Sequence, residues 1–523
     1  MKYCILAAGL GTRNNAMPGL HKALLPIENV PMISHIINKF NKQKEIIVAV
    51  GHKAEQIKSY LNFVHADRKI KFIVIDRFSG KGSGPGYSLL QCKKYLQCPF
   101  VFVPVDTFID ENIKFNVNNN WIGVTKILKK NSKKYCLIRG KQKLESIYYG
   151  EGNLAYNGIA GIYDYSNFWK ALEKPNLINN EHQVTTAFEG IRNVKLKYFK
   201  NLYDTGTDES YLKIKKKFSK EIVFPKNNET IFIDNNKVVK YFSNELKCQN
   251  RVQRAKYLKK FTVKIKKLGS NMFGYEFIEG KLLSNITSKE IFSNFLEKYY
   301  KFAFTNNTPN DSKKFHINCK YMYKTKTYER IKIFQNQDID NISYINGIFV
   351  EPIINIINKI DWNKIISTSL PTNFHGDLQP ENIIISKNNE IFLIDWRESF
   401  GNDLKIGDFY YDLSKLYHGL IINGTIAKEK KFKIKIQKNK ARISYFSKNN
   451  LLKFNKILEY FCQKHNIDYD IVKLLGALHY LNIAEFYKTT EKEYSNFIFL
   501  LGKLLMSEYL NKLQLENGSF KIN

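Results

Sequence analysis

The clearest chemical pattern in this 523-residue chain lies between positions 374 and 401. Asp377 and Asn382 stand in the spacing H-G-D-x4-N, and Asp395 follows a β-branched run. Transfer of a phosphoryl group from a nucleotide needs a carboxylate that takes the proton of the acceptor hydroxyl. It also needs oxygen ligands for the magnesium ion that bridges the phosphates. These residue types therefore predict phosphoryl-transfer chemistry.

Two apolar runs must position these side chains. Ile383–Ile385 and Ile391–Ile394 flank a polar turn at residues 387–390, a pattern typical of a β-hairpin. Such a hairpin would hold Asn382 near its start and Asp395 just past its end, on the same side.

The segment resembles the catalytic and metal-binding loops of the aminoglycoside phosphotransferase and choline kinase family, relatives of protein kinases. The resemblance implies that Asp377 is the catalytic base and that Asn382 and Asp395 are metal ligands. It also implies that His375 orients the catalytic loop. Asp412, in the phrase GDFYYDLSKLYHGL, would be a structural acid that supports this loop.

The region upstream resembles the small lobe of such kinases, because ETIFIDNN, VVKYF and MFGYEFIEGKLL predict short strands. The resemblance implies that Lys240 is the strand lysine that holds nucleotide phosphates, and that the adenine contacts the linker from Glu276 to Ile278. The sequence departs from the kinase pattern, since only Asn235-Asn236, and no Gly-rich loop, precedes the lysine. Glu245 is the only near acid that could pair with Lys240.

A second set of candidate residues lies near the N-terminus. The apolar run YCILAA leads into a turn containing Gly9 and Gly11, whose backbone amides could approach a phosphate closely. Arg13 and Lys22 could neutralise the phosphate charge. The spacing is neither GxxxxGK[ST] nor a full GxGxxG, so it supports neither a P-loop nor a dinucleotide-binding fingerprint.

The phrases LAAGLGTR and HKALLPIENVPMI resemble the signature of sugar nucleotidyltransferases and their choline-phosphate cytidylyltransferase relatives. In that family the Gly-rich loop wraps the nucleotide, and an arginine and a lysine contact its phosphates. The resemblance gives these nucleotide-binding roles to Gly9, Gly11, Arg13 and Lys22, and makes Arg13 and Lys22 catalytic as well. Residues 14–19 would form a flap over the nucleotide.

Two acids are candidates for the metal site of this first reaction. Asp106 ends the apolar run FVFVPVD, and Asp204 stands in YDTGTDESY, which resembles the family's W-x-D-T-G-T-x-E-x-Y phrase. The resemblance implies that both bind one magnesium ion, which would offset the charge of a nucleoside triphosphate. A turn followed by a helix N-cap is the alternative for residues 204–207.

The remaining candidates are contacts with the base and the acceptor. The glycine run at residues 80–86 would read the base, with Gly84 as the candidate, although an ordinary turn fits it as well. The resemblance would bring Asn157 and Gly158 near the phosphorylated substrate, with Glu181 contacting acceptor hydroxyls or an ammonium. A Gly-broken strand and an exposed acid explain these residues equally well.

The pattern of elements predicts an α/β protein of two domains. Alternating strands and helices over residues 1–220 predict a Rossmann-like nucleotidyltransferase domain with a mostly parallel sheet. Residues 221–523 would form a bilobal, protein-kinase-like α+β domain. Its small lobe would span about 221–285, and its helical large lobe 286–523.

Composition limits the broad class. A hydrophobic content of 44% and an aromatic content of 14% are ample for packed cores. The net charge of +34 suits nucleic acid or phosphorylated small molecules, but the lysines are scattered, so nucleic acid is the minority interpretation. The seven cysteines show no ligand spacing, and no stretch approaches the ~20 apolar residues of a membrane span. We therefore expect a reduced, cytoplasmic protein.

Together the two resemblances imply a bifunctional enzyme with Mg²⁺ as cofactor and small molecules as partners. It would phosphorylate a small alcohol with ATP and couple the ester to a nucleotide, with CTP and CDP-choline as the best match, for decoration of a surface polysaccharide. The rival enzyme is a sugar 1-kinase fused to a sugar-1-phosphate nucleotidyltransferase. The rival of another class is a basic nucleic-acid-binding scaffold with degenerate enzyme folds. The sequence leaves the acceptor and the oligomeric state open.

Overall fold

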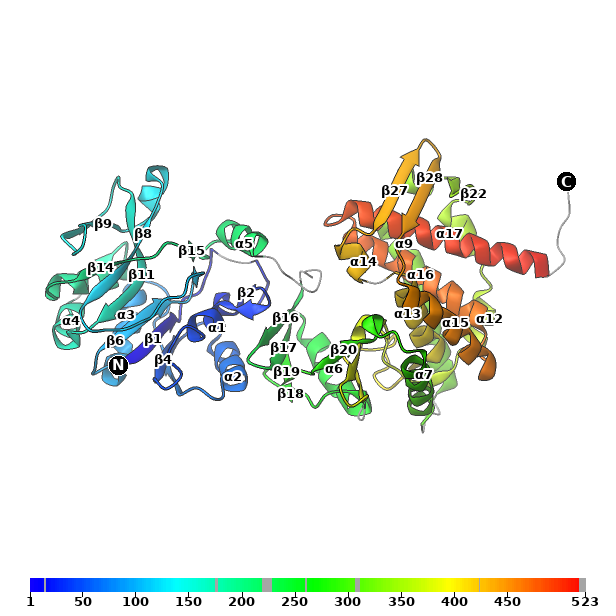
Figure 1. The fold of residues 1–523 in the computed structure, drawn as a ribbon, viewed down its shortest axis with the longest axis horizontal. Helices are drawn as coiled ribbons and strands as arrows, with labels where there is room; N and C mark the ends of the chain where they lie inside the picture. Colours follow the sequence, from blue (N-terminus) through cyan, green and yellow to red (C-terminus); the bar gives the residue numbers. More distant parts are fainter. Residues whose placement is uncertain are drawn as a thin grey trace. The chain divides into compact units, whose positions relative to one another are not determined.

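The structure, a computed structural model, describes residues 1–13, 16–174, 177–218, 228–258, 261–305, 311–422 and 424–516. The chain divides into two compact units, which are best followed separately in Figure 1. The first unit contains Met1–Glu245 and Lys266–Phe277, and the second contains Leu246–Ile265 and Ile278–Asn523. The domain boundary predicted after residue 220 lies outside the described residues.

Four parallel strands form the centre of the first unit, in the order β6-β1-β4-β5. They are β1 (Lys2–Ala7), β4 (Ile46–Val50), β5 (Ile70–Val74) and β6 (Phe100–Pro104). Parallel strands need crossover helices, which cover both faces, so the inner strands are apolar almost throughout. The predicted Rossmann-like fold with a parallel central sheet is confirmed for this unit.

Antiparallel strands extend the sheet beyond β6. Strand β11 (Leu154–Ile162) pairs antiparallel with β6 and with β8 (Trp121–Lys126), and its register shifts between Tyr156 and Ala160. The sheet is completed by β9 (Leu137–Arg139), β10 (Ser146–Tyr148) and β14 (Lys195–Tyr198), of which β14 pairs parallel with β8. The shift is a bulge, which aims the backbone at residues 157–159 away from the regular ladder.

Helices cover both faces of this sheet (Figure 1). One hydrophobic core lies under α1 (Met32–Ile37) and α2 (Ala54–Val64), and the other under α3 (Pro85–Gln91) and α4 (Tyr165–Leu172). A two-stranded ladder of β7 (Thr107–Ile109) and β15 (Leu202–Asp204) precedes α5 (Asp208–Lys217). The remaining short strands are β2 (Pro26–Ile27), β3 (Val30–Pro31), β12 (Leu177–Ile178) and β13 (Glu181–His182).

A small antiparallel sheet joins the core of the first unit. It contains β16 (Glu229–Asp234), β17 (Lys237–Phe242), β19 (Met272–Glu276) and β18 (Lys266–Lys267). The strands predicted upstream of the catalytic segment are thereby confirmed. They pack on the same hydrophobic core as α2, with the rings of Tyr60 and Phe232 5.6 Å apart.

The second unit is mainly helical. Its helices are α6 (Glu245–Leu258), α7 (Lys289–Ala303), α8 (Ser312–Lys320), α9 (Lys326–Phe334), α10 (Gln337–Asp340), α11 (Ile353–Asn358), α12 (Trp362–Ser367), α13 (Phe409–Ile421), α14 (Gly424–Lys428), α15 (Asn449–Lys464), α16 (Tyr469–Tyr487) and α17 (Lys492–Glu516). Within the described ranges, none of the helices is both long and apolar enough to cross a lipid bilayer.

Over the described residues of this unit, three small sheets lie among the helices. They contain β20 (Gly280–Leu282), β21 (Tyr344–Ile345), β22 (Ile348–Phe349), β23 (Pro371–Asn373), β24 (Ile383–Ser386), β25 (Ile391–Leu393), β26 (Ile406–Asp408), β27 (Phe432–Gln437) and β28 (Lys440–Tyr445). Strands β24 and β25 pair antiparallel, with Ile383 opposite Leu393. The hairpin predicted from the two apolar runs is therefore confirmed.

Candidate functional site

The two acids predicted to share a metal ion lie side by side in the first unit. Asp106 follows β6, and the pairing of β15 with β7 sets Asp204 opposite Thr107. The amide of Thr205 donates a hydrogen bond to the Asp106 carbonyl at 2.9 Å. The ammonium of Lys22 lies 2.9 Å from Asp106 Oδ2. The fold thus joins residues that are about a hundred positions apart in the chain.

Gly206 shows how closely the charged groups converge. A Cβ at this glycine would lie 3.0 Å from Asp204 Oδ1, 3.8 Å from Asp106 Oδ2 and 3.9 Å from Arg13 Nη2. The Gly206 amide donates to Asp204 Oδ1 at 2.7 Å. All four charged residues predicted to surround the nucleotide phosphates therefore lie in one place.

The electrostatics of this cluster fit a divalent cation. Burial acts to raise the pKa of Asp106, but the charge and hydrogen bond of Lys22 outweigh it, so that this pKa is lowered. Burial raises the pKa of Asp204, and the negative charge of Asp106 raises it further. Two carboxylates that repel each other are the donors Mg²⁺ prefers when substrate phosphates complete its coordination.

The Gly-rich turn after β1 packs around a histidine that the sequence did not single out for a role. His21 is buried, its Nδ1 accepts from the Ala23 amide at 3.0 Å, and its Nε2 lies 3.3 Å from the Gly9 carbonyl. Burial lowers the pKa of His21 to about 3, so a neutral ring with Nε2–H donates to Gly9. Gly11, at φ 67°, lies against the Lys22 stem, where a Cβ would be 3.1 Å from Cδ.

A cavity of about 320 Å³ lies beside this turn. It is lined by Leu10, Thr12, Met17, Gly19, Leu20, His21, Lys22, His52 and Lys53. Its volume is at the lower end of the range for small-molecule sites. The flap predicted at residues 14–19 contributes Met17 and Gly19, whereas Asn14 and Asn15 lie outside the described residues.

The predicted base-reading loop and one predicted acceptor residue are neighbours. Gly84 has φ 124°, and a Cβ there would lie 2.8 Å from the His182 carbonyl and 3.1 Å from Glu181 Cβ. The His182 amide donates to the Ser83 carbonyl at 2.7 Å. The loop therefore requires glycine at position 84 because a second backbone segment touches it.

Replacing Gly84 tests this packing. Gly84→Ala is expected to cost about 1–3 kcal/mol beyond the control Gly80→Ala, because it adds a clash with backbone to a left-handed conformation. Gly80 also has a left-handed φ, 82°, but among the described residues a Cβ there would meet no atom within 4 Å. Thermal unfolding of both variants measures the difference, and equal losses would contradict the assigned contact.

The other predicted acceptor residues lie at the bulge of β11. Asn157 Nδ2 donates to Thr125 Oγ1 at 3.2 Å, and its Oδ1 accepts from the Ile159 amide at 3.2 Å. Gly158 has φ 86°, and a Cβ there would lie 2.8 Å from Pro104 Cγ. Since Pro104 ends β6, the bulge borders the strand that leads to Asp106.

Comparisons with known proteins agree with this geometry. The family model described as "MobA-like NTP transferase domain" matches residues 3–113. The N-terminal part of the chain is a MobA-like NTP transferase domain. The matched residues contain the Gly-rich turn, Lys22 and Asp106, so the family covers most of the charged cluster.

Curated relatives match parts of the chain. The bifunctional protein GlmU of Methanococcus vannielii is 31% identical over 24% of this chain and 30% of its own length. The D-glycero-alpha-D-manno-heptose 1-phosphate guanylyltransferase of Campylobacter jejuni is 29% identical over 34% of this chain and 73% of its own length. The chain thus spans less than a third of the first relative.

Among solved structures, the CTP:phosphocholine cytidylyltransferase of Streptococcus pneumoniae aligns with 42% of this chain and 99% of its own chain. The identity is 18% and the TM-score is 0.37.

Outside the NTP transferase domain, the second unit brings together Asp377, Asn382 and Asp395. Asn382 Nδ2 donates to the Asp377 carbonyl at 2.8 Å and lies 3.3 Å from Asp377 Oδ2. The Ile394 amide donates to the Asn382 carbonyl at 2.9 Å, so the two ends of the hairpin meet as predicted. Asp395 has φ 59°, a left-handed conformation that non-glycine residues rarely adopt outside constrained sites.

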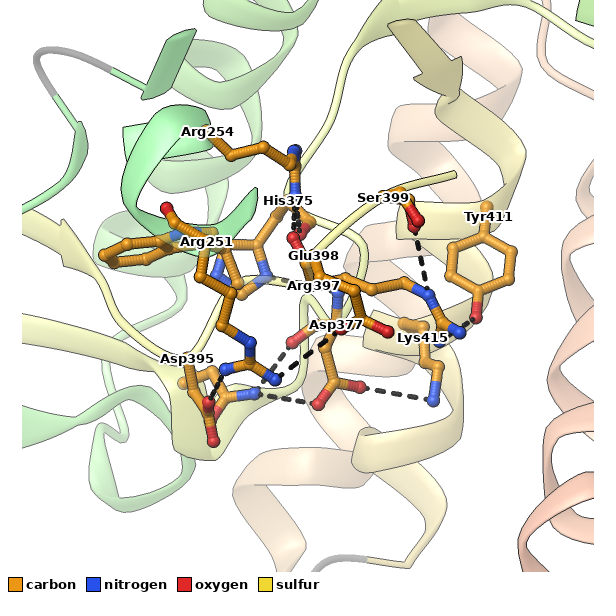
Figure 2. Close-up of polar contacts among 12 residues, drawn as sticks. Arg251, Arg254, His375, Asp377, Asp395, Arg397, Glu398, Ser399, Tyr411 and Lys415 are labelled. Carbon is orange, nitrogen blue, oxygen red and sulfur yellow. Dashed lines mark hydrogen bonds and ion pairs between the residues drawn. The ribbon is translucent and has the colours of Figure 1, made fainter. Parts of the chain in front are cut away.

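Two arginines of α6 hold this loop, and sequence reasoning assigned them no role. Figure 2 shows the Arg251 guanidinium ion-paired with Asp395. Arg254 is buried and donates to the carbonyls of Leu404, at 3.0 Å, and of Phe374 and Arg397. The signal in the sequence was the spacing R-x-x-R, which puts both arginines on one face of the helix.

Asp412 accepts hydrogen bonds from the loop that contains Asp377, as predicted. Its Oδ2 accepts from the His375 amide at 2.8 Å, and its Oδ1 accepts from the Gly376 amide at 2.6 Å. Tyr299 OH donates to Oδ2 at 2.6 Å. The His375 ring is buried and lies 2.9 Å from the Ile394 carbonyl, and burial lowers its pKa to about 4, which suits an orienting group rather than a proton carrier.

Asp412→Asn tests this support. The amide can accept on one atom only, so we expect a loss of about 1–3 kcal/mol of unfolding free energy at pH 7. Burial raises the pKa of Asp412 to about 6, so the folded protein takes up this proton before the unfolded chain does. Stability from this group therefore grows as the pH falls from about 7 to about 4.

Chemical denaturation across that pH range measures the effect. The gap between the wild type and Asp412→Asn should widen as the pH falls, whereas the exposed control Asp338→Asn should show no such trend. A gap that shrinks toward low pH would contradict the assignment.

The predicted small-lobe residues take the following positions. Lys240 is buried on β17, opposite Ile231 on one side and Phe273 on the other. Glu276 ends β19 and forms an ion pair with Lys237. Lys240 and Glu276 belong to the first compact unit and Ile278 to the second, so their assembly with Asp377 stays a prediction.

The oxygens of the second unit also fit magnesium. With Asn382 Nδ2 engaged by Asp377, the amide Oδ1 is the atom left for a metal, and Asp395 supplies a carboxylate. Within the described ranges, no three His, Cys, Asp or Glu side chains gather as a protein-only metal site. One carboxylate and one amide suit Mg²⁺ bound largely through nucleotide phosphates and water.

Proposed function

We propose that this protein is a bifunctional transferase. The second unit would phosphorylate a small alcohol with ATP, and the NTP transferase domain would couple the phosphate ester to a nucleotide and release pyrophosphate. CTP is the proposed nucleotide, so that the product is a CDP-alcohol. The convergence of Arg13, Lys22, Asp106 and Asp204 carries the first half of the proposal.

In the nucleotidyl transfer, the phosphate ester attacks the α-phosphorus of the nucleoside triphosphate and pyrophosphate leaves. Mg²⁺ held by Asp106 and Asp204 would neutralise the triphosphate. Lys22 and Arg13 would stabilise the negative charge that develops on the α-phosphoryl oxygens and the leaving group. Catalysis would rest on this charge neutralisation and on in-line positioning.

In the phosphoryl transfer, the acceptor oxygen forms a bond to the γ-phosphorus of ATP while the bond to the ADP oxygen breaks. Asp377 would accept the hydroxyl proton. Its carboxylate is held by Gln379 Nε2 at 3.0 Å and by Lys415 Nζ at 3.2 Å. These contacts fix the orientation of a base on the loop that Asp412 supports.

A second candidate is a sugar 1-kinase joined to a sugar-1-phosphate nucleotidyltransferase that makes a nucleotide-sugar. It is favoured by the similarity to the heptose 1-phosphate guanylyltransferase over 73% of that relative. The nucleic-acid-binding scaffold is less well supported, because degenerate folds have no need for paired acids at both sites.

One assay separates these candidates. The purified full chain is incubated with Mg²⁺, ATP, each of CTP, UTP, GTP and dTTP, and a panel of amino alcohols, polyols and free sugars, and the products are identified by mass spectrometry. A CDP-alcohol would support the first proposal and a nucleotide-sugar the second. No product from any combination, with ester and NTP supplied directly as well, would contradict both.

A further inference from the structure

Two cationic side chains flank Asp377 on the side away from the candidate metal ligands. Figure 2 shows Arg251 and Asp395 on one side of Asp377, and Lys415 and Arg397 on the other. If the metal and the ATP phosphates bind at Asp395, an in-line transfer requires the acceptor hydroxyl to approach from the opposite side. The cations therefore lie where the acceptor must bind.

Arg397 carries a charge that the protein does not neutralise by an ion pair. Its Nε donates to the Ser399 carbonyl at 3.1 Å, and its Nη1 donates to Tyr411 OH at 3.3 Å. In the part of the chain that the structure describes, no salt bridge joins this guanidinium to a carboxylate. Only two of its five N–H donors are used by these side-chain contacts, so the others remain for a ligand.

Lys326 adds an amine from α9, a helix that packs on α16. Asn482 Nδ2 donates to Thr327 Oγ1 at 3.1 Å, and Arg330 forms an ion pair with Glu485. These two contacts with α16 fix the turn of α9 that contains Lys326. Lys326 is partly buried. Over the described residues, its ammonium has neither a hydrogen-bond acceptor nor an ion-pair partner.

The environment of Lys326 is strongly positive. Burial, followed by the charges of Arg397, Lys415 and Arg330, lowers the pKa of Lys326 to about 6, and Glu398 opposes this only in part. Lys326 is therefore mostly a neutral amine at pH 7, and an anion bound beside it would favour its charged form. Glu398 is also shared with Arg251, whose Nη2 lies 3.9 Å away.

Asp377 pairs with Lys415, and against the effect of burial the charges of Glu398 and Asp377 both raise the pKa of Arg397, so these carboxylates offset part of the positive charge. Within the described residues Lys326 and Arg397 have no ion-pair partner, and partly buried cations without such a partner favour a bound anion.

We infer that Lys326, Arg397 and Lys415 bind an anionic group of the acceptor alcohol, either a carboxylate or a phosphate. This inference rests on the proposed phosphorylation at Asp377 and narrows its substrate class. A quaternary ammonium would be repelled at the same position. An acceptor such as a hydroxy acid or an alcohol phosphate therefore fits the second unit better than choline does.

Matched alcohols test the inference in the full chain. ADP release is measured with glycerol, glycerate, glycerol 3-phosphate, glucose, glucose 6-phosphate and choline. We expect kcat/KM to be at least about 10-fold higher for an anionic member than for its neutral counterpart, and lowest for choline, because one charge-assisted contact is worth about 10- to 100-fold. The preferred member shows whether the anion is a carboxylate or a phosphate.

Lys326→Met gives the second measurement, with Lys332→Met, an exposed lysine of the same helix, as the control. We expect Lys326→Met to raise KM for the anionic acceptor about 10- to 100-fold with little change in kcat, and to leave neutral acceptors unaffected. Unchanged KM, or equal use of charged and neutral alcohols, would overturn the inference.

Calorimetry of glycerol 3-phosphate and glycerate binding separates this result from failure of the proposed phosphorylation. If no alcohol yields ADP, the phosphorylation is wrong, but binding that Lys326→Met weakens and Lys332→Met does not would still support an anion site. No binding and no turnover would overturn both.

Discussion

Asp377→Asn is expected to lower ATP-dependent phosphorylation of the acceptor alcohol by about 10²- to 10⁴-fold. The amide has almost the shape of the carboxylate but cannot take the hydroxyl proton at neutral pH. The change also removes the negative partner of Lys415, which lies 3.2 Å from Asp377 Oδ1. Steady-state ADP release, with the acceptor at saturation, measures the loss in kcat.

The nucleotidyl transfer in the first unit is the control for Asp377→Asn. Asp377→Asn should leave unchanged the release of pyrophosphate from CTP and a supplied phosphate ester, because Asp106 and Asp204 are untouched. Unfolding by circular dichroism checks that the second unit is intact. A folded Asp377→Asn protein that kept full ADP release, or lost both activities, would contradict separate sites.

Asp106→Asn is expected to have the opposite effect. It removes one of the two carboxylates that fit the metal, together with the partner of the Lys22 ammonium 2.9 Å away. We expect pyrophosphate release to fall about 10²- to 10³-fold, as when one preorganised electrostatic contact of a transition state is lost. The Mg²⁺ concentration needed for half-maximal rate should rise, while ADP release should stay at the wild-type level.

Asp110→Asn is the matched control, since Asp110 is an exposed acid just beyond β7. It should retain pyrophosphate release. Chelation of Mg²⁺ should stop both reactions in the wild type, and readdition should restore them. If Asp106→Asn retained nucleotidyl transfer at low Mg²⁺, the assignment of Asp106 as a metal ligand would be wrong.

Local pattern determined much of the fold. The runs at Ile383–Ile385 and Ile391–Ile394 form the predicted hairpin, because β-branched residues around a polar turn favour pairing within a short loop. The strands and helices of the first unit follow from alternating apolar runs and Gly-rich turns. The phrase LAAGLGTR indicated the NTP transferase domain, because its glycines and its arginine stand close together in the chain.

Two features of the first unit needed the tertiary structure. Gly84 and Glu181 are both candidates from sequence, but only the fold makes them neighbours, since a backbone contact between segments so far apart in the chain is not encoded in either of them. His21 has no ligand spacing, yet it links the Gly9 carbonyl to the Ala23 amide, which directly follows Lys22.

The sequence by itself determined which residues are the candidates for chemistry in each unit, because Asp106, Asp204, Asp377, Asn382 and Asp395 stand in short motifs whose spacing is local. Only the tertiary structure decided what surrounds them. Arg251, Lys326, Arg397 and Lys415 come from four separate segments and look in the sequence like any of its 82 lysines and arginines. Their roles depend on long-range packing and on burial. An exposed charge is screened by water and salt, whereas a buried charge is stable only beside an opposite charge.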